Sequence, residues 1–296
     1  MHVSYSHYIE LLYYNLLYKN NKKINFSFEF FPPKNNKMES CLWNSINQLT
    51  SFKPKFFSVT YGANSGEKHK TSETVYSIMK KTGINTAAHL TCIDSNKNEL
   101  INIAKNYWKN GVNHIIALRG DSFDINSKPR MHAIDLVYLL KEVADFDISV
   151  AGYPEVHPEA NNSQYDLVNL KNKVQAGANR VITQFFFDTS AYLRFRDRCA
   201  KIGINVEIIP GILPIYNFNQ IKKFASTTNV KIPLWAHKIF GSLENSPDVN
   251  KILSAHIVIN MISVLCSEGI QNFHFYTLNK SEIIYPICHL LKSNTM

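Results

Sequence analysis

The chain has 296 residues and is 45% hydrophobic, which is enough to bury a substantial core in one large domain or two ordinary ones. Its formal net charge is +9, but the lysines and arginines are dispersed, so the charge is weak evidence for a nucleic-acid partner. The five cysteines form no C-x-x-C pair and no spacing suited to zinc or an iron–sulfur cluster, so we expect no metal site.

The first 23 residues, rich in tyrosine and leucine, are predicted to form an N-terminal helical extension. One side of such a helix would be lined by Tyr8, Leu11, Leu12, Asn15 and Leu16, and we expect it to pack on the body of the protein or on another subunit. The segment lacks the basic start, apolar middle and cleavage site of a secretory signal. No apolar run approaches the roughly 20 residues that span a bilayer. We therefore expect a soluble cytoplasmic protein with no membrane partner.

The first predicted strand, INFSFEFFPPK at residues 24–34, places one carboxylate among phenylalanines. Alternation puts Phe26, Phe28 and Phe30 on one face of the strand and Glu29 on the other, and the double proline ends the strand. An exposed side chain is the ordinary interpretation of a lone glutamate in a strand. If phenylalanines surround the carboxyl instead, its pKa should rise and make it a general acid near neutral pH.

Eight apolar runs recur along the chain, and each is followed by a segment with helical spacing. The runs occupy residues 26–33, 56–62, 86–92, 114–121, 148–155, 180–187, 206–213 and 273–279. Helical spacing is clearest at residues 135–146 and 191–203. Eight strand–helix units in about 250 residues predict parallel pairing and a single α/β domain, a (β/α)8 TIM barrel spanning residues 1–296. An open doubly wound sheet is the alternative, but neither G-x-G-x-x-G nor G-x-x-x-x-G-K-[ST] occurs.

In such a barrel the chemistry belongs to the carboxyl ends of the strands. Hydrogen-bonding side chains are concentrated there, at Glu29, Thr60, Tyr61, His89, Arg119, Asp121, Tyr153, Glu155, His157, Gln184, Asn279 and Lys280. Asp121, preceded by Arg119 and the flexible Gly120, should stay ionised, so that it and Glu29 could perform different tasks. No Ser-His-Asp set is recognisable. The pattern therefore indicates proton transfer and aromatic-ligand stacking rather than hydrolysis.

The same residues also have plain structural interpretations. His89 could be a satisfied core histidine, and Arg119 could be the structural partner of an Asp121 that caps the next loop. The three phenylalanines at 185–187 are most simply core. A helix starting near Ser163 could be capped by nearby polar residues, namely His157, Asp166 and Asn169.

The assembled segments resemble one known family, the bacterial 5,10-methylenetetrahydrofolate reductases. The similar segments run in order along nearly the whole chain and are SFEFFPPK, SVTYGANSGE, HLTCID, ALRGD, YPEVHPEA, ITQFFFD, IIPGILP and HFYTLN. The resemblance implies a (β/α)8 barrel with tightly but non-covalently bound FAD at its carboxyl end. It also implies a ping-pong cycle in which NADH reduces FAD and 5,10-methylenetetrahydrofolate is then reduced to 5-methyltetrahydrofolate, supplying methyl groups for methionine synthesis.

The resemblance assigns roles residue by residue. Glu29 would protonate the bridging nitrogen and open the imidazolidine ring to an iminium cation, which Asp121 would stabilise beside the flavin. The residues that would bind substrate are Asp121, Gln184, Gln220, Phe224 and Lys280, with Phe224 serving NADH and folate in turn. The residues that would hold FAD are Thr60, Tyr61, Ala63, His89, Arg119, Gly120, Asp121, His132, Ala133, Tyr153, His157, Asp166, Asn169, Asn172 and Lys173.

Four positions depart from the family pattern. Lys280 stands where the family has Arg, which keeps the positive charge but loses the bidentate fork, so we expect lower folate affinity. Asn172 replaces a basic residue near the FAD phosphates, His132 replaces an aromatic Tyr beside the flavin, and Gly152 replaces Ala; each could weaken FAD retention. From the family we expect NADH rather than NADPH, a homotetramer, and no adenosylmethionine-binding regulatory domain.

Two alternatives remain at this point. Another FAD-binding barrel oxidoreductase, such as a relative of proline dehydrogenase, would bind the flavin but would not be oxidised by methylenetetrahydrofolate. A basic nucleic-acid-binding protein would show a steep salt dependence of binding and no bound chromophore.

Overall fold

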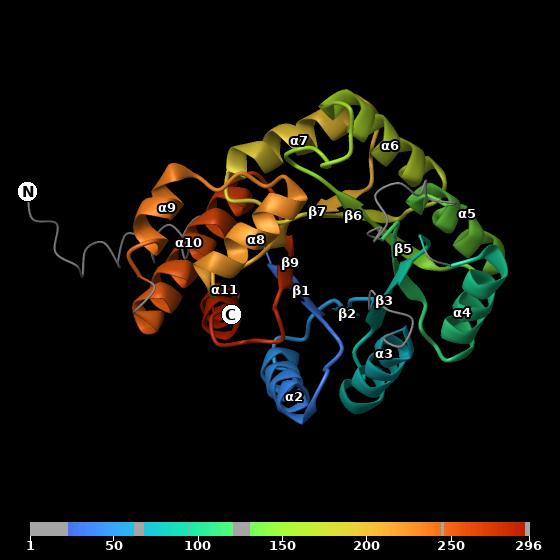
Figure 1. Ribbon diagram of the computed structural model, residues 1–296, viewed down its shortest axis with the longest axis horizontal. Helices are drawn as coiled ribbons and strands as arrows, with labels where there is room; N and C mark the ends of the chain where they lie inside the picture. Colours follow the sequence, from blue (N-terminus) through green and yellow to red (C-terminus); the bar gives the residue numbers. More distant parts are fainter. Residues whose placement is uncertain (1–22, 62–67, 94, 121–130, 244–245, 294–296) are drawn as a thin grey trace, which may run out of the picture.

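The computed structural model describes residues 23–61, 68–93, 95–120, 131–243 and 246–293, and in this part of the chain parallel strands form a ring surrounded by helices (Figure 1). The strands are β1 (Asn25–Phe30), β2 (Phe57–Val59), β3 (Thr86–Thr91), β4 (His114–Leu118), β5 (Asp147–Gly152), β6 (Arg180–Thr183), β7 (Glu207–Ile209), β8 (Gly211–Ile212) and β9 (Asn272–Tyr276). The helices are α2 (Asn36–Thr50), α3 (Lys68–Thr82), α4 (Lys97–Lys109), α5 (Ala133–Val143), α6 (Ser163–Gln175), α7 (Thr189–Lys201), α8 (Phe218–Thr228), α9 (Leu234–Phe240), α10 (Pro247–Ser267) and α11 (Ile284–Ser293). The predicted α/β barrel is confirmed.

The ring closes at Pro210, which divides one predicted strand into β7 and β8. Proline has no N–H to donate to a ladder, so β7 pairs only with β6 and β8 pairs only with β9 among the described strands. The carbonyl of Pro210 accepts a hydrogen bond from the His274 N–H at 3.0 Å. Gly211 is required next, because a Cβ at this position would lie 2.1 Å from the Thr183 carbonyl oxygen.

The alternation predicted for β1 is confirmed. Phe26, Phe28 and Phe30 are at most 1% exposed and belong to the main core between the strands and the surrounding helices. Phe28 packs on Phe275 of β9, with ring centroids 5.8 Å apart. Glu29 therefore lies on the opposite face of β1, inside the barrel.

The amino-terminal half of the barrel interior is filled by a small apolar cluster and a polar network. The apolar cluster contains Phe56, Ala87, Ile116, Ile182 and Ile209. Next to it, His114 Nε2 lies 2.8 Å from Ser149 Oγ and 3.0 Å from Arg180 Nη1, and Arg180 pairs with Asp147 at 2.7 Å. This filling makes the interior a packed core rather than a channel, and it leaves the carboxyl end for chemistry.

Helices α8 and α9 build a second core beside β8 and β9 (Figure 1). Phe185 and Phe187, which follow β6, belong to this second core, while Phe186 belongs to the main one, so the prediction that all three are core residues is confirmed. Helices α8 and α9 therefore pack around a core of their own beside β8 and β9.

Helices α5 and α7 each begin two residues before their predicted start.

Helix α10 corrects one expectation from the sequence. Its 21 residues are long and apolar enough, by length and composition, to cross a membrane. Polar residues such as Asn250 and Ser254 interrupt the apolar pattern, which is why the run is not obvious in the sequence. In the fold these two residues are buried, as are Val258, Ile262 and Leu265 on the same face, so this face packs inside the protein.

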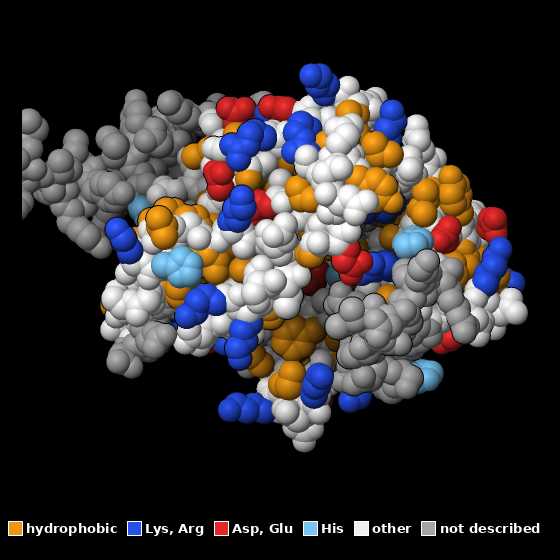
Figure 2. Space-filling model, turned by 45° about the horizontal axis from the view of Figure 1, so that its top comes forward, with side chains coloured by type: hydrophobic (Ala, Val, Ile, Leu, Met, Phe, Trp, Pro, Cys, Tyr) orange, Lys and Arg blue, Asp and Glu red, His pale blue; other side chains and the backbone are white. Residues whose placement is uncertain are grey.

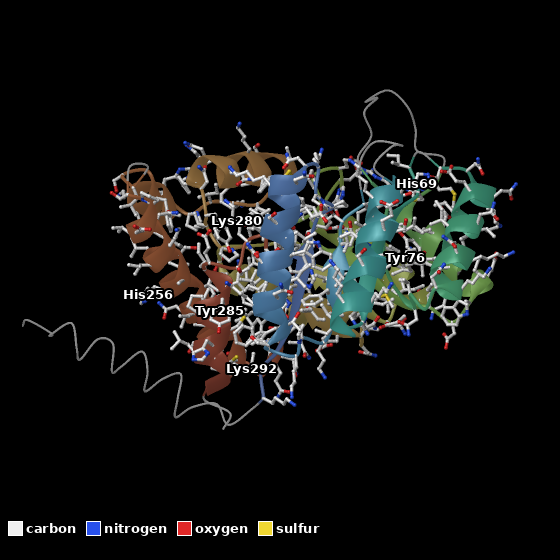
Figure 3. All side chains as sticks on the ribbon, turned by 90° about the horizontal axis from the view of Figure 1, so that it is seen from below. His69, Tyr76, His256, Lys280, Tyr285 and Lys292 are labelled. Atoms are coloured by element: carbon white, nitrogen blue, oxygen red, sulfur yellow. The ribbon has the colours of Figure 1, made fainter. Side chains whose placement is uncertain are left out.

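Charge is dispersed on the surface as it is in the sequence. Figure 2 shows lysines and arginines scattered among acidic and apolar side chains on the visible face, with no continuous basic stripe there. Lys280 lies towards one end of the barrel and Lys292 towards the other (Figure 3). The visible face thus shows no concentrated basic surface among the described residues.

Candidate active site

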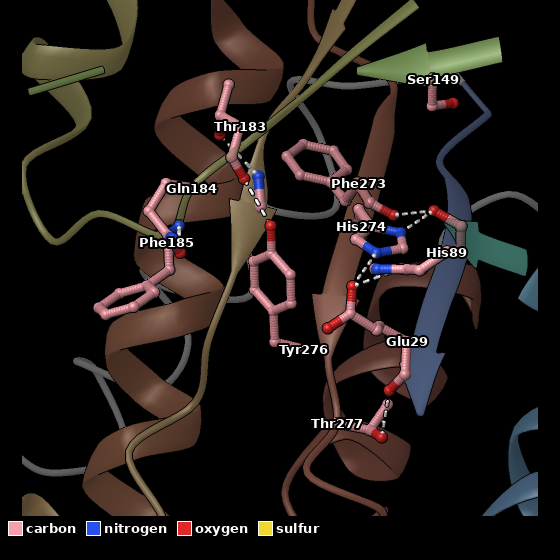
Figure 4. Close-up of polar contacts among 12 residues, drawn as sticks. Glu29, His89, Ser149, Thr183, Gln184, Phe185, Phe273, His274, Tyr276 and Thr277 are labelled. Atoms are coloured by element: carbon pink, nitrogen blue, oxygen red, sulfur yellow. Dashed lines mark hydrogen bonds and ion pairs between the residues drawn. The ribbon is translucent and has the colours of Figure 1, made fainter. Parts of the chain in front are cut away.

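Glu29 lies beside His89 and His274 (Figure 4), and Ser27 contacts His274 from its other side; we define these four residues as the acid cluster. The Oε2 atom of Glu29 is 3.2 Å from Nε2 of His89 on β3 and 3.6 Å from Nε2 of His274 on β9. The glutamate side chain is 16% exposed, so it is not an ordinary surface residue. Both Nε2 atoms are buried and make no hydrogen bond within the described residues, so their polar contact is the carboxylate.

The expectation of a raised pKa for Glu29 was wrong. Burial raises the pKa of Glu29, as expected, but the charges and close polar contacts of His89 and His274 have the larger combined effect and lower it to about 2. The prediction assumed that phenylalanines surround the carboxyl, whereas those of β1 point outward to the helices. Glu29 therefore rests as a carboxylate between two imidazoles.

His274 is fixed from its other side by Ser27. Its Nδ1 lies 2.8 Å from Ser27 Oγ, and the Ser27 hydroxyl donates to the Phe273 carbonyl at 3.4 Å. The imidazole also stacks on Phe56, with ring centroids 5.7 Å apart. Sequence reasoning did not assign a role to Ser27 or His274, although the segment HFYTLN was noticed as a motif.

Tyr276 and Gln184 border the acid cluster. The Tyr276 hydroxyl donates to the Thr183 carbonyl at 2.7 Å, and burial together with the nearby Glu29 charge raises its pKa. Gln184 is half-buried, and its Oε1 accepts a hydrogen bond from the N–H of Phe185 at 3.0 Å. Its side-chain nitrogen has two N–H groups, and neither donates a hydrogen bond to the described residues.

A second group of predicted residues forms a rim over β4 to β6, which we define as Arg119, His157, Asp166 and Lys173. Asp166, Asn169 and Lys173 share one face of α6, because they are three and four residues apart. Asp166 Oδ2 accepts a hydrogen bond from the N–H of His157 at 2.9 Å. The helix begins at Ser163 as predicted, but its cap is Asn162, whose Oδ1 accepts from the Tyr165 N–H.

Lys173 is the most enclosed cation of the rim. Its Nζ donates to the Ala151 carbonyl at 2.8 Å. Burial lowers its pKa to about 8, against the opposing effect of Asp166. Burial likewise lowers the pKa of His157, whose ring packs edge-on against Tyr153 with centroids 4.6 Å apart. Asn169 and Asn172 are exposed on the same helix.

Arg119 completes the rim at the end of β4. Its guanidinium forms a two-pronged ion pair with Glu159, and its Nε donates to the Gly120 carbonyl at 3.1 Å. Gly120 has φ +93°, a conformation that suits glycine. His132 is exposed and precedes α5, where its N–H donates to Asp135 Oδ2 at 2.7 Å; Ala133 is the first residue of that helix.

Thr60 and Tyr61 extend β2 towards the same end. The Thr60 N–H donates to the Phe30 carbonyl at 2.9 Å. The Tyr61 hydroxyl is buried without a hydrogen-bond partner among the described residues, and burial raises its pKa.

The remaining predicted ligand residues lie on the α8 side. Gln220 is exposed in the first turn of α8, and Phe224 is half-buried one turn later. Lys280 is exposed, with Nζ 5.4 Å from the centroid of the Tyr216 ring. Ala63 and Asp121 lie outside the described residues, as does the predicted extension before Lys23.

The structure thus separates the predicted residues into an enclosed acid cluster and an open rim. In the described residues, no group of three or more His, Cys, Asp or Glu side chains could hold a metal ion. In the acid cluster one oxygen of a buried carboxylate lies close to two imidazole nitrogens. Such an arrangement can hold a proton and transfer it.

The family model described as "Methylenetetrahydrofolate reductase" matches residues 15–292. The chain belongs to the methylenetetrahydrofolate reductase family. A 5,10-methylenetetrahydrofolate reductase of Salmonella typhimurium is 60% identical over 269 residues, which cover 91% of each chain. One of Buchnera aphidicola subsp. Baizongia pistaciae is 52% identical over 296 residues, which cover all of both chains.

A solved structure has the same fold at low sequence identity. It is an uncharacterised Clostridium thermocellum protein described as binding two copies of 5-methyl-5,6,7,8-tetrahydrofolic acid, with a TM-score of 0.66, 16% identity and coverage of 96% and 99% of the two chains. The activity of this chain is methylenetetrahydrofolate reductase activity, which supplies 5-methyltetrahydrofolate. The resemblance found in the sequence is confirmed, and the family is flavin-dependent.

Proposed function

We propose that the chain reduces 5,10-methylenetetrahydrofolate with electrons from NADH in a ping-pong cycle through FAD. The observation that supports this most is the enclosed Glu29 carboxylate, which faces the barrel mouth between two imidazoles. Glu29 is the general acid that protonates the bridging nitrogen of the substrate, which opens the imidazolidine ring to an electrophilic iminium. FAD held at the barrel mouth would supply the hydride chemistry, linking oxidation of NADH to reduction of the methylene carbon.

The residues of the rim fit a flavin dinucleotide. Arg119 and Lys173 supply two cations for a pyrophosphate, and the half-buried Lys173 ammonium is held in place by the Ala151 carbonyl. Tyr61 adds a buried hydroxyl without a partner among the described residues. The positive φ of Gly120 lets the backbone pass close to a ligand. The other residues proposed to hold FAD are Thr60, Ala63, His89, Asp121, His132, Ala133, Tyr153, His157, Asp166, Asn169 and Asn172.

Substrate and NADH use the side of the mouth that faces α8. Gln184 supplies amide donors next to the acid cluster, and Gln220 and the Phe224 ring supply an amide and a stacking surface. Lys280 supplies a positive charge for a folate carboxylate. Asp121 stabilises the iminium cation. We further propose a cytoplasmic homotetramer with NADH preferred over NADPH.

An anaerobic absorbance experiment on the purified protein tests the proposal. NADH should bleach the flavin band, and 5,10-methylenetetrahydrofolate should restore it. A protein that bleaches but is not reoxidised by the folate would remove the folate half of the cycle. A colourless protein that cannot be reconstituted with FAD would overturn the flavin assignment.

A further inference from the structure

The two oxygens of Glu29 have different surroundings. Oε2 faces both imidazoles, whereas Oε1 forms no hydrogen bond or ion pair with the described residues and is turned away from the rings (Figure 4). One oxygen can therefore be used by the substrate while the other stays in contact with histidine. The terminal torsion of glutamate, χ3, is broad and two-fold, so the carboxyl group can rotate. A proton gained on the oxygen near the imidazoles can thereby be turned towards the substrate.

The Ser27 contact favours one tautomer of His274. When Nδ1 carries the proton, it donates to Ser27 Oγ at 2.8 Å, and the Ser27 hydroxyl is then available to donate to the Phe273 carbonyl at 3.4 Å. In this tautomer Nε2, 3.6 Å from Glu29 Oε2, is the atom that can gain or lose a proton.

The distance of 3.6 Å is slightly longer than a hydrogen bond, and such contacts commonly tighten when substrate binds. The His274 ring is 0% exposed, so water does not compete for Nε2 from the bulk. Stacking on Phe56 keeps the ring aimed at the carboxylate. These contacts give His274 a fixed orientation and one functional partner.

On this basis, and resting on the proposed function, we propose that His274 is the positioning residue that reloads Glu29 with its proton, with Ser27 holding the imidazole in the required tautomer. Before the folate half-reaction, the Glu29–His274 pair holds one shared proton on Nε2 or Oε2. Glu29 gives this proton to the bridging nitrogen of the substrate, which leaves a carboxylate and a neutral imidazole. The pair then takes one proton from water before the next turnover.

The charged groups around His274 determine how the pair responds to pH. Those that face it or lie one contact away are Glu29 on β1, His89 on β3, His114 on β4, Arg180 on β6 with its partner Asp147 on β5, Glu207 on β7 and Tyr276 on β9. His114 accepts from Arg180, and burial together with that charge keeps its pKa well below the usual value, so it is neutral. Glu29 is therefore the anionic partner available to His274 at the barrel mouth.

The test uses His274→Gln, which keeps a polar side chain but cannot carry the proton, with His114→Gln as the matched control. Both replace a buried histidine inside the barrel, but His114 contacts Ser149 rather than Glu29. The holoenzyme is reduced with NADH in a stopped-flow instrument and then mixed with 5,10-methylenetetrahydrofolate. We expect His274→Gln to slow the folate half-reaction about 100-fold while the NADH half-reaction changes by less than about twofold.

The pH profile separates proton supply from a structural effect. His274→Gln should change the pH profile of the folate half-reaction, because Glu29 Oε2 then faces His89 alone, whereas His114→Gln should keep the wild-type profile. Ser27→Ala should slow the same half-reaction about tenfold. An unchanged rate and pH profile in His274→Gln, or equal losses in both half-reactions, would overturn the proposal.

A readout without substrate keeps the two proposals distinguishable. In ¹⁵N-histidine NMR spectra of the resting holoenzyme, the His274 signals should show a protonated Nδ1, and Glu29→Gln should shift the Nε2 resonance. The role of His274 would be overturned if Nδ1 carried no proton, or if the Nε2 chemical shift were the same in Glu29→Gln as in the wild type. Either result would count even if the wild type turns over. Failure of the wild type to be reoxidised by the folate would instead count against the proposed function.

Discussion

The acid cluster and the rim differ in how they are built. The acid cluster brings together residues of β1, β3 and β9, and its Ser27–His274 contact joins positions 247 residues apart. The rim is largely local, since Asp166 and Lys173 lie on one helix and His157 lies nine residues before Asp166. The acid cluster is buried in the barrel, while the rim partner Glu159 is 62% exposed. The enclosed cluster suits proton transfer, and the open rim suits reversible binding of a large anionic cofactor.

This difference predicts two kinds of failure. A change in the acid cluster should block one chemical step and leave cofactor binding intact. A change in the rim should weaken cofactor binding and leave the chemistry of the saturated enzyme intact.

The largest effect is expected for Glu29→Gln, which removes the proton donor but keeps the shape of the side chain. The folate half-reaction should fall by about 10³-fold or more, while flavin reduction by NADH stays within about twofold. Single-turnover kinetics measure both. Glu39→Gln in the first turn of α2 is the control for loss of a carboxylate, and a comparable loss there would contradict the assignment.

Lys173→Met should weaken FAD binding by about 10- to 100-fold, because a charge-assisted hydrogen bond to a phosphate contributes about 1.5–3 kcal/mol. Because burial lowers the Lys173 pKa to about 8, the wild-type affinity should also fall as pH rises through that region and the ammonium loses its charge. Fluorescence titration with FAD at several pH values measures both effects. The variant should lack this pH dependence, whereas Lys171→Met should keep it.

Gly152→Ala should destabilise the fold by about 1–3 kcal/mol, because the new Cβ would lie 2.6 Å from Val181 Cγ1. The clash is on the side of α7, so the Kd for FAD should change by less than about twofold. Urea unfolding measures the stability. Adding Val181→Ala should recover part of the loss, and a large change in FAD affinity would place Gly152 in the rim instead.

The smallest effect is expected for Lys280→Arg. An arginine adds a planar fork for a carboxylate, so the KM for the folate should fall by about threefold with kcat unchanged. Steady-state kinetics at saturating NADH measure this. A higher KM would mean that the contact between Lys280 and the Tyr216 ring is the better arrangement for this chain.

The sequence predicts the barrel well for a physical reason. Strand alternation in β1 is a local pattern, and local patterns determine which face each residue takes. The rim residues follow from the family resemblance, and their role in holding FAD stays a prediction. The break at Pro210 was missed because the run around it is otherwise a good strand, although proline removes a ladder hydrogen bond.

The acid cluster was predicted only in part, because its properties depend on contacts between distant strands. Glu29 was identified from its setting among phenylalanines, but the sign of its pKa shift depends on His89 and His274, which no local pattern connects to it. The residues around His274 form an ordinary apolar strand, so the local sequence does not distinguish this histidine from a core histidine. Its significance follows from the register of β9 beside β1, which places Ser27 next to it.

The most direct test of the account measures both half-reactions in Glu29→Gln and Lys173→Met, each saturated with FAD. The account predicts that Glu29→Gln is reduced by NADH but is not reoxidised by 5,10-methylenetetrahydrofolate, whereas Lys173→Met performs both steps at nearly wild-type rates. Loss of both steps in Glu29→Gln, or a persistent folate defect in saturated Lys173→Met, would contradict the separation of proton transfer from cofactor binding.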